Sequence, residues 1–484
     1  MPVNTGVSPS VRNPQSFHAF AYSQGGRSLV PLTPRVLLIG TQKGGTAVAG
    51  AITQINDPVE TDALYGVGSS LALMCRKAFD TSALLGRGPQ LFACGVAEPG
   101  GGTARASTFT VTGPATAAGN VVIRVSGRTF TIGVAVGDTA TTIAVAIAAA
   151  INAAKQYVRV TAVAAAGVVT CTDVQKGVGG NDVVFEAVSA PAGVTNAWVQ
   201  TIAGAGTADE TTALANAAGP DFDGIALENH VSGDITLALA HVTTAWTAGE
   251  KKWRWITIGE PGTLGTATPL ASAANDRAIA VINCNGSPSL PGEFAAAAIV
   301  ALFVPSRPNG NWDGMQLPLY PPYDAQVMTT SQIESALAAG VTPLMPVINN
   351  RVTVPGVLKI VKFVTTCTTQ NSQPFEALRD IAVPRTGAFI ARQIDAAFAA
   401  RFSASAANPD GALMTDDIVP QIRDMVANIL YAMQAALIVK NVDADLQQLV
   451  VEPDPNAPGR VNIDVAYTVV LGLHQVAFVH RVKI

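Results

Sequence analysis

The chain has 484 residues, 49% of them apolar but only 13% charged, and a formal net charge of −4 at pH 7. Because a typical soluble protein carries roughly 25% charged residues, this chain can bury a large core but has little charge to cover a monomer's surface. We therefore expect much of its surface to lie against other protein. The same figures argue against a disordered chain, and the absence of a Lys/Arg cluster argues against a nucleic-acid binder.

The cysteines and the apolar stretches also bear on the protein class. The five cysteines form no CxxC pair, which predicts buried thiols in a reducing compartment rather than a disulfide framework or a zinc site. The polar start of the chain predicts no signal peptide. The longest apolar stretches, 294–304 and 425–439, are shorter than the ~20 residues of a membrane span, so we expect a soluble intracellular protein. The cysteines are Cys75, Cys94, Cys171, Cys284 and Cys367.

Residues 1–34 contain five prolines and no sustained periodicity, which is typical of an extended arm. From Arg35 onward, short apolar runs at 36–40, 91–96, 224–227, 253–258 and 278–282 predict strands buried on both faces. Helical patterns separate them, one capped by Ser69 or Ser70, another capped near Ser232, and a third over 294–303. This alternation predicts a mostly parallel α/β sheet formed by residues 35–99 and 207–343.

Residues 100–206 follow a different pattern. Alternating Thr/Val-rich runs at 120–125, 129–136, 158–163 and 168–172 surround one Ala-rich helix at about 141–154. Glycines at 100–102 and 204–206 flank the segment. We therefore expect an inserted β-rich domain that protrudes and whose two ends lie close together.

The last part of the chain predicts an α+β domain at 344–460, followed by terminal strands at 461–484. Two helices are expected, one with Ile390, Ile394, Phe398 and Phe402 on one face and another from about Asp416 to Lys440. Residues 461–471 alternate as a half-buried strand. The apolar alternation at 476–484 predicts a strand that either closes its own sheet or joins a neighbour's.

Two glycine-rich segments could suggest nucleotide binding. The segment 40–46 follows a strand as a phosphate loop would, but Thr46 stands where the lysine is needed, so we interpret the segment as a turn. Gly66 and Gly68 lack the third glycine of a dinucleotide fingerprint. We therefore predict no cofactor. His18, His241, His474 and His480 have no metal-ligand spacing among them, so we predict no metal site either.

A hydrolase-like site is the enzymatic alternative. Ser70 opens a helix after a glycine, as a nucleophile elbow does, and His230 follows the carboxyl end of a predicted parallel strand. Asp221 and Asp223 could complete a triad. The serines are better explained as helix caps, because no strand directly precedes them, and His230 as a polar loop residue. We therefore predict that the chain is not an enzyme.

A series of loose motifs, taken together and in order, resembles the sheath proteins of contractile phage tails, particularly the Mu-like branch. The likeness covers nearly the whole chain, although Lys362 and Phe363 stand where many relatives have an arginine before Val-Thr-Thr. The motifs lie at 34–40, 61–69, 127–128, 137–140, 149–152, 177–182, 305–308, 340–343, 364–366 and 460–462.

The resemblance implies a structural subunit with a central domain of the fold often called subtilisin-like. Such subunits form hexameric rings around a tail tube and contract to drive the tube through the host envelope. Their partners are further copies, the tube protein, and baseplate and tail terminator proteins, with no nucleic acid and no membrane insertion. The C-terminal region would face the tube and the insertion would face outward. Assembly in the bacterial cytoplasm into a virion tail is expected.

Strand exchange between neighbouring subunits is what the two arms would provide under this resemblance. An extended proline-rich arm at one end and a bare alternating strand at the other suit the addition of strands to a neighbour's sheet. A tailocin or secretion-system sheath is equally compatible, and a surface-layer or capsid component is a further assembly class. The residues expected to exchange are Val476, Phe478, Val479, Val482 and Ile484 in the C-terminal arm and Phe17, Phe20 and Tyr22 in the N-terminal arm.

Overall fold

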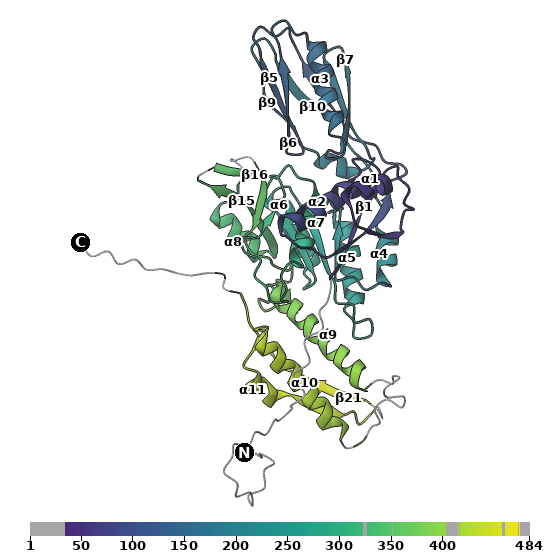
Figure 1. The fold of residues 1–484 in the computed structure, drawn as a ribbon, viewed down its shortest axis with the longest axis vertical. Helices are drawn as coiled ribbons and strands as arrows, with labels where there is room; N and C mark the ends of the chain where they lie inside the picture. The colour runs from purple at the N-terminus through teal and green to yellow at the C-terminus, as the bar shows by residue number, and fades with distance from the viewer. Residues whose placement is uncertain are drawn as a thin grey trace, which may run out of the picture. The chain divides into compact units, whose positions relative to one another are not determined.

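The computed structural model describes residues 34–322, 327–350, 352–402, 415, 417–456, 460–472 and 474 (Figure 1). These residues form two compact units, and each is described by itself. The larger unit contains the described residues of Leu32–Ala388 and Leu471–Ile484, and the smaller unit those of Phe389–Val470.

The larger unit is built on a sheet to which the described residues contribute nine strands. β1 pairs in parallel with β3 and β11, and the parallel pairing continues through β12 and β13 to β15. β2, β14 and β16 pair antiparallel at the edges. The order is β14 (Gln316–Leu317), β16 (Val352–Ile360), β15 (Val341–Asn349), β13 (Ile279–Asn283), β12 (Trp255–Glu260), β11 (Gly224–Leu227), β1 (Arg35–Gln42), β3 (Gln90–Ala97) and β2 (Ile52–Ile55).

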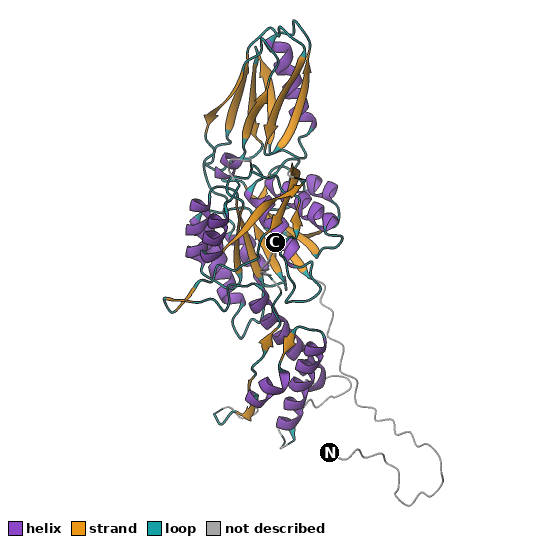
Figure 2. Cartoon of the chain, turned by 90° about the vertical axis from the view of Figure 1, so that its left-hand side faces the viewer, coloured by secondary structure: helices purple, strands orange, loops and turns teal. Residues whose placement is uncertain are grey.

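Helices cover both sides of this sheet (Figure 2), which is why the parallel strands are continuous apolar runs. Every residue of β11 is buried, and Val36–Ile39 of β1 are fully buried. α2 and α7 pack on β1 together, and all residues of α7 are buried. The helices are α1 (Pro58–Tyr65), α2 (Ser70–Leu84), α4 (Thr211–Ala218), α5 (Ser232–Ala245), α6 (Leu264–Ala274), α7 (Pro291–Leu302) and α8 (Thr330–Ala338).

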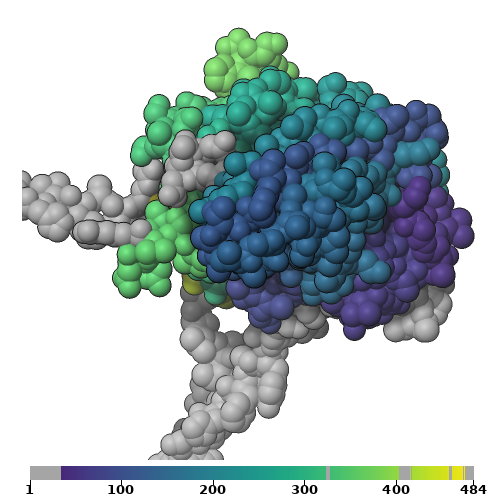
Figure 3. Space-filling model, turned by 90° about the horizontal axis from the view of Figure 1, so that it is seen from above, coloured from purple at the N-terminus to yellow at the C-terminus, as the bar shows by residue number. Residues whose placement is uncertain are grey.

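Residues 100–206, here called the insertion, form two further sheets around their own apolar core, with α3 (Ala140–Ala153) packed on both (Figure 1). Its two ends meet, because Thr103 and Ala205 exchange backbone hydrogen bonds of 3.0 and 3.1 Å. In the space-filling view from above, the blue surface of the insertion faces the viewer in front of other parts of the larger unit (Figure 3). One sheet has the order β10 (Asn196–Ile202), β4 (Ala106–Val111), β8 (Val168–Asp173), β7 (Val160–Ala165), and the other β6 (Arg128–Val134), β5 (Gly119–Val125), β9 (Phe185–Ser189); η1 (Val178–Asp182) precedes β9.

The smaller unit packs the end of α9 (Ala382–Phe402) and α10 (Ile418–Ala435) around a separate core. The buried face of α10 includes Ile422, Met425 and Val426, as the periodicity predicts. Two short antiparallel pairs complete the unit. They are β19 (Val439–Lys440) with β22 (Thr468–Val469), and β20 (Val450–Pro453) with β21 (Val461–Asp464); the turns α11 (Val442–Asp445) and η3 (Leu446–Gln448) lie between β19 and β20.

The predicted mixed α/β architecture with several sheets is confirmed, and several element boundaries differ. α10 ends at Ala435 rather than near Lys440, because Leu437 has a positive φ of 59° and Val439 joins a strand. The single strand expected over 461–471 is two strands, because β21 and β22 pair with different partners. The cap of α5 is Val231 with Asp234, and Ser232 is the first helical residue.

β15 runs through the boundary that the sequence predicts between residues 343 and 344. Its first three residues pair in parallel with β13, and the rest pairs antiparallel with β16. Residues 344–360, which the sequence assigns to the C-terminal domain, are therefore part of the large sheet.

The contact between β12 and α7 allows no side chain at Gly259, and this can be tested. A Cβ at Gly259 would overlap the carbonyl of Pro291 and the Cβ of Phe294. We expect G259A to lower the free energy of unfolding by about 1–3 kcal/mol through overpacking, measured by denaturant titration. G233A, where nothing lies within 4 Å on α5, is the control and should cost nothing. Equal stability of the two variants would contradict this packing.

Candidate functional site at the carboxyl ends of the sheet

The candidate site lies where the order of the parallel strands reverses. β3 follows β1 in this sheet on one side, and the later strands continue from β11 on the other side. Ligands of open α/β sheets bind at such a reversal, beyond the carboxyl ends of the strands. Here the carboxyl ends of β1 and β11 bring Thr41 beside Glu228, whose Oε2 accepts the Thr41 N–H.

A side chain of the insertion occupies this position. Arg159, which directly precedes β7, donates from Nη1 to Glu228 Oε1 at 2.9 Å and from Nε to both carboxylate oxygens of Asp173 at 3.0 and 3.1 Å. The side chain of Arg159 is 3% exposed. The guanidinium therefore joins one carboxylate of its own domain to one carboxylate of the large sheet, away from water.

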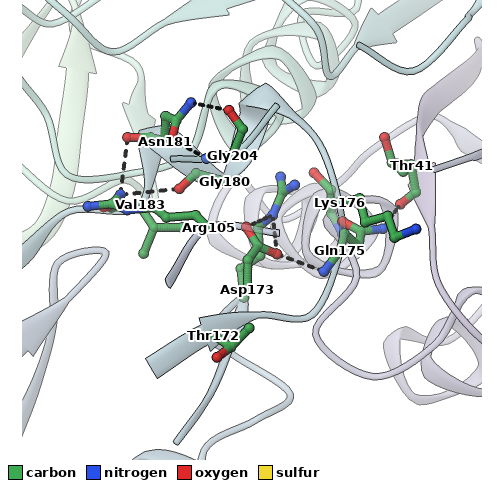
Figure 4. A network of polar contacts seen from close by, with 12 residues as sticks. Thr41, Arg105, Thr172, Asp173, Gln175, Lys176, Gly180, Asn181, Val183 and Gly204 are labelled. Atoms are coloured by element: carbon green, nitrogen blue, oxygen red, sulfur yellow. Dashed lines mark hydrogen bonds and ion pairs between the residues drawn. The ribbon is translucent and has the colours of Figure 1, made fainter. Parts of the chain in front are cut away.

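Gln175 makes a second link between the insertion and the sheet (Figure 4). Its side chain donates to the Thr41 carbonyl at 2.7 Å and accepts the Ser70 N–H at 3.0 Å, and its backbone N–H donates to Asp173 at 2.8 Å. A backbone donor at the start of α2 is thus satisfied by the insertion rather than by water. We call Thr41, Arg159, Asp173, Gln175 and Glu228 the junction network.

The loop that closes this network is fixed by its own hydrogen bonds (Figure 4). Arg105 donates to the carbonyls of Gly180, Asn181 and Val183. Asn181 exchanges two hydrogen bonds with Gly204, at 3.0 and 2.9 Å. The fixed loop holds Asp182 close to His230, with Oδ1 and Nε2 separated by 3.9 Å.

Burial perturbs the carboxyl groups around the network. It raises the pKa of Asp182 to about 6, although His230 and Arg159 lower it, and it raises the pKa of Asp234 to about 6. Burial also raises the pKa of Glu210 well above its ordinary value, with Asp234 and Glu228 adding to the shift. For Arg159, burial lowers the pKa, but Asp173 and Glu228 outweigh it and the net shift is upward. Arg159 therefore stays charged, and this charge offsets part of the negative charge around it.

Ser70 and His230, the candidate hydrolase residues, line one small cavity with Arg159 and Glu228. The cavity has a volume of about 10 Å³, which is room for roughly one water molecule. Among the hydrogen bonds of the described residues, none joins Ser70 to His230. The cap of α2 is Ser69, which accepts the Ala72 N–H at 3.2 Å.

The triad with Asp221 or Asp223 is wrong. Asp223 precedes β11 and accepts the backbone N–H of Arg35 at 2.8 Å, at the amino ends of β11 and β1. His230 lies beyond the carboxyl end of β11. The strand therefore separates the two carboxylates from the imidazole.

The segment 40–46 is only partly the turn that the sequence predicts, because residues 40–42 are the end of β1 and the loop begins at Lys43. Lys43, Thr46 and Ala47 donate backbone hydrogen bonds to carbonyls of Tyr65, Ala63 and Leu64, at 3.0, 3.0 and 2.9 Å. These bonds hold the loop on the end of α1. The Lys43 ammonium pairs with Glu98.

The five cysteines are buried and none is in a disulfide, as expected from their spacing. Burial raises the pKa of Cys94 to about 11 and of Cys171 to about 12. Within the described ranges, no group of three or more His, Cys, Asp or Glu side chains has a geometry that could hold a metal. No helix among the same residues is long and apolar enough to cross a membrane.

All eight residues predicted to exchange strands lie outside the described residues, so their pairing stays a prediction. They are Phe17, Phe20, Tyr22, Val476, Phe478, Val479, Val482 and Ile484.

The junction network was missed from the sequence. Its partners are far apart in the chain, with Arg159 separated from Glu228 by 69 positions. One signal was present, because Arg159 lies between Val158 and Val160 and interrupts an apolar run with a charge. A charge in such a run suggests a buried partner.

The comparisons with known proteins find tail sheath proteins among those that this chain resembles. No family model matches the chain. A curated relative, the Mu-like prophage FluMu tail sheath protein of Haemophilus influenzae, is 23% identical over 444 residues, which are 89% of this chain and 88% of the relative. The resemblance of this chain to Mu-like tail sheath proteins is thereby confirmed.

Solved structures extend the comparison to the fold. The sheath tail protein of Listeria innocua has a TM-score of 0.52 at 15% identity and covers 92% of this chain and 93% of its own. The sheath tail protein of Desulfitobacterium hafniense has a TM-score of 0.49 at 16% identity and covers 90% of this chain and 93% of its own. The Listeria structure shows that the fold is shared.

The buried ion pair predicts a large cost for removing the arginine. We expect R159M to lower the free energy of unfolding by about 3–5 kcal/mol, because two buried carboxylates lose their cation. Denaturant titration measures this. R124Q is the matched control, since Arg124 pairs with Glu186 at 2.9 Å in the insertion but both side chains are 32% exposed, and it should cost below about 1 kcal/mol. If R159M lowered the free energy of unfolding by as little as R124Q, Arg159 would not be the buried partner of the two carboxylates.

The raised pKa of Asp182 predicts a pH dependence of stability. The pKa of Asp182 is about 6 in the folded chain and near 3.9 in the unfolded chain. Between these two pH values the carboxyl is mostly protonated in the folded chain and mostly ionised in the unfolded chain. The stabilisation is complete below about pH 4 and is lost as the pH rises through about 6. We expect the unfolding free energy of D182N to fall less between about pH 4 and pH 7, by up to ~3 kcal/mol. D80N, at an exposed position of α2, is the control and should show the same change of unfolding free energy with pH as the parent. The same change in D182N as in the parent would contradict the prediction.

Proposed function

We propose that this chain is the structural subunit of a contractile tail sheath, which polymerises as hexameric rings around a tail tube and contracts to drive the tube through a host envelope. The observation that carries the proposal is the sequence similarity to a tail sheath protein over 89% of this chain and 88% of the relative. Since the similarity extends over nearly all of both chains, it concerns the whole subunit rather than one shared domain.

The geometry of the junction network supports a structural role. The position where an α/β sheet would bind a ligand is filled by Arg159 and Gln175 of the same chain. The cavity that remains holds roughly one water. On this basis we propose that the chain is not an enzyme and takes no cofactor. An active-site serine probe on the parent and on S70A tests this, since labelling of the parent alone would support the hydrolase alternative.

We propose a domain organisation to match. The large sheet would have the subtilisin-like fold, with residues 100–206 as an inserted domain facing outward and the C-terminal region facing the tube. Residues 1–34 and 461–484 would be the arms that add strands to sheets of neighbouring copies. The direct partners would be further copies, the tube protein, and baseplate and terminator proteins. Assembly would take place in the bacterial cytoplasm and yield a virion tail.

A tailocin sheath or a secretion-system sheath is an equally compatible alternative for the same subunit. Both alternatives share the tube, the rings and the contraction, so nothing in the fold separates them from a phage tail. The genes that flank the coding sequence distinguish them.

Assembly and its dependence on the C-terminal arm provide the test. We expect the purified full chain at raised concentration to form tubes of uniform diameter in negative-stain electron microscopy. Deleting Val476–Ile484 should leave a folded protein that forms no tubes, because the exchanged strand is lost. Circular dichroism checks the fold.

The control for the deletion keeps the arm and changes only side chains. R481A/K483A retains the backbone and the apolar residues that would pair, and should still form tubes. Tubes from the deletion variant would contradict strand exchange through this arm. Flat sheets or closed shells from the full chain would favour a surface-layer or capsid protein.

A further inference from the structure

A second cavity lies between the insertion and the helices on the large sheet. Its volume is about 150 Å³, which is roughly ten times the space that one water needs. It is smaller than the roughly 300–1,000 Å³ of pockets for drug-sized ligands. α2, the turn between β5 and β6, and residues 157–159 contribute to its wall. We call it the interdomain cavity.

Two residues that line the interdomain cavity have a buried polar atom with no hydrogen-bond partner among the described residues. They are Ser126, through Oγ, and Arg76, through Nε. Ser126 is only 7% exposed. An arginine N–H can only donate, and a serine hydroxyl donates as well as accepts. Because an unpaired buried donor is costly, these two groups indicate a ligand that accepts hydrogen bonds from both.

The backbone of Ser126 shows what this side chain contributes. Ser126 and Gly127 form the two-residue turn between β5 and β6, with positive φ values of 47° and 80°. Glycine or asparagine is the usual residue for such a turn. Gly127 lies against the ring of Tyr320, which a Cβ at this position would overlap. Serine has no conformational advantage here, so its contribution to this site is the hydroxyl.

Two guanidinium groups lie on one aromatic ring beside the cavity. The Arg128 guanidinium lies 4.4 Å from the centroid of Tyr157, and that of Arg76 lies 5.5 Å from the same centroid. Arg76 also pairs with Asp62 through Nη2, which leaves Nε free of that contact. No ion pair or hydrogen bond joins the Arg128 guanidinium to another side chain of the described residues. Arg128 therefore supplies a positive charge that no carboxylate of this part of the chain takes up.

The carboxylates of the lining do not fill the role of the ligand. Glu293 Oε2 accepts the Leu290 N–H at 3.1 Å, and its Oε1 lies 3.7 Å from Lys77 Nζ. Both oxygens of this acid therefore have partners. Asp80 is the other acid of the lining, and it is exposed. Cations outnumber acids in the lining, with Arg76, Lys77, Arg128 and Arg159 against Asp80 and Glu293.

We propose that the interdomain cavity binds a tetrahedral oxyanion, of which inorganic phosphate is the simplest. Ser126 Oγ and Arg76 Nε donate hydrogen bonds to it, and Arg128 supplies charge. A carboxylate is matched by the fork of one guanidinium, whereas these donors come from α2 on one side and from the hairpin turn of the insertion on the other. A phosphate group has at least three strong acceptor oxygens for such a set. The bound anion joins the insertion to the large sheet, in addition to Arg159 and Gln175.

Phosphate binding to the unassembled full chain tests the proposal without reference to tube formation. Isothermal titration calorimetry at constant ionic strength should show saturable binding of phosphate at a single site. The unfolding temperature should rise with phosphate concentration, because a ligand that binds only the folded chain stabilises it by mass action. Acetate, a planar carboxylate, should give no saturable heat over the same concentrations. No saturable phosphate binding, or equal affinity for acetate, would overturn the proposal.

Two variants and a matched control locate the site. S126G removes the hydroxyl and keeps a residue that tolerates a positive φ, and R128Q removes the charge without breaking an ion pair. Each should weaken phosphate binding about tenfold or more, since an interaction with a charged group is lost. R124Q removes one charge from the same hairpin, but Arg124 pairs with Glu186 and does not line the cavity.

R124Q should therefore bind phosphate as the parent does. Parental affinity in S126G or in R128Q would overturn the proposal, because phosphate would then bind elsewhere. An equal loss of affinity in R124Q would also overturn it, because the effect would then follow net charge alone. The unfolding temperature without phosphate verifies that each variant is folded.

Discussion

The buried guanidinium of Arg159 is the interaction on which the arrangement of the larger unit depends. It is the cation between Asp173 of the insertion and Glu228 of the large sheet, and both ion pairs lie out of water. A buried charge is tolerated only when it is paired and hydrogen-bonded, so the insertion can lift away from the sheet only by exposing or stranding three charges at once. Gln175 strengthens this constraint by satisfying backbone groups of the sheet side. The glycines at the ends of the insertion therefore allow the chain to turn, but they do not act as free hinges.

The junction network also affects how many of the few charged residues remain on the surface. Only 13% of the residues are charged, and several of these are buried inside the larger unit, so the surface has even fewer charges than the composition indicates. They are Arg159, Asp173, Glu210, Glu228, Asp234, Arg254, Glu260, Glu293 and Arg385. Meanwhile, large apolar side chains of the insertion are exposed, among them Val136, Val163 and Val199 at 66%, 68% and 56%. A surface with this balance is suited to contact with other protein.

The elements that were predicted well are those whose signal lies within one short segment of the sequence. β1 and β11 are apolar runs because both faces of the sheet are covered, and Ser69 caps α2 through its own side chain. β15 was harder to predict, because Gly340, Pro343 and Pro346 indicate a boundary although the strand continues through both prolines.

The predictions that depended on distant parts of the chain were less complete. The junction network could not be derived, because the pairing of Arg159 with Glu228 exists only after the insertion has folded back on the sheet. His230 was placed correctly at a carboxyl end, but the acids thought to accompany it lie at the other end of β11. Likewise, the break between β21 and β22 depends on which strands come to lie beside them.

We propose that the ends of the chain make the assembly, while the junction network leaves no open ligand site at the carboxyl ends of the large sheet. A helical reconstruction of the polymer by electron cryomicroscopy tests it most directly, at a resolution that allows the chain to be traced through residues 471–484. We expect residues 476–484 of one copy to pair as a strand with a sheet of a neighbouring copy, with the Arg159–Glu228 contact intact. Pairing of that strand within its own copy, or an insertion detached from the sheet in the polymer, would contradict it.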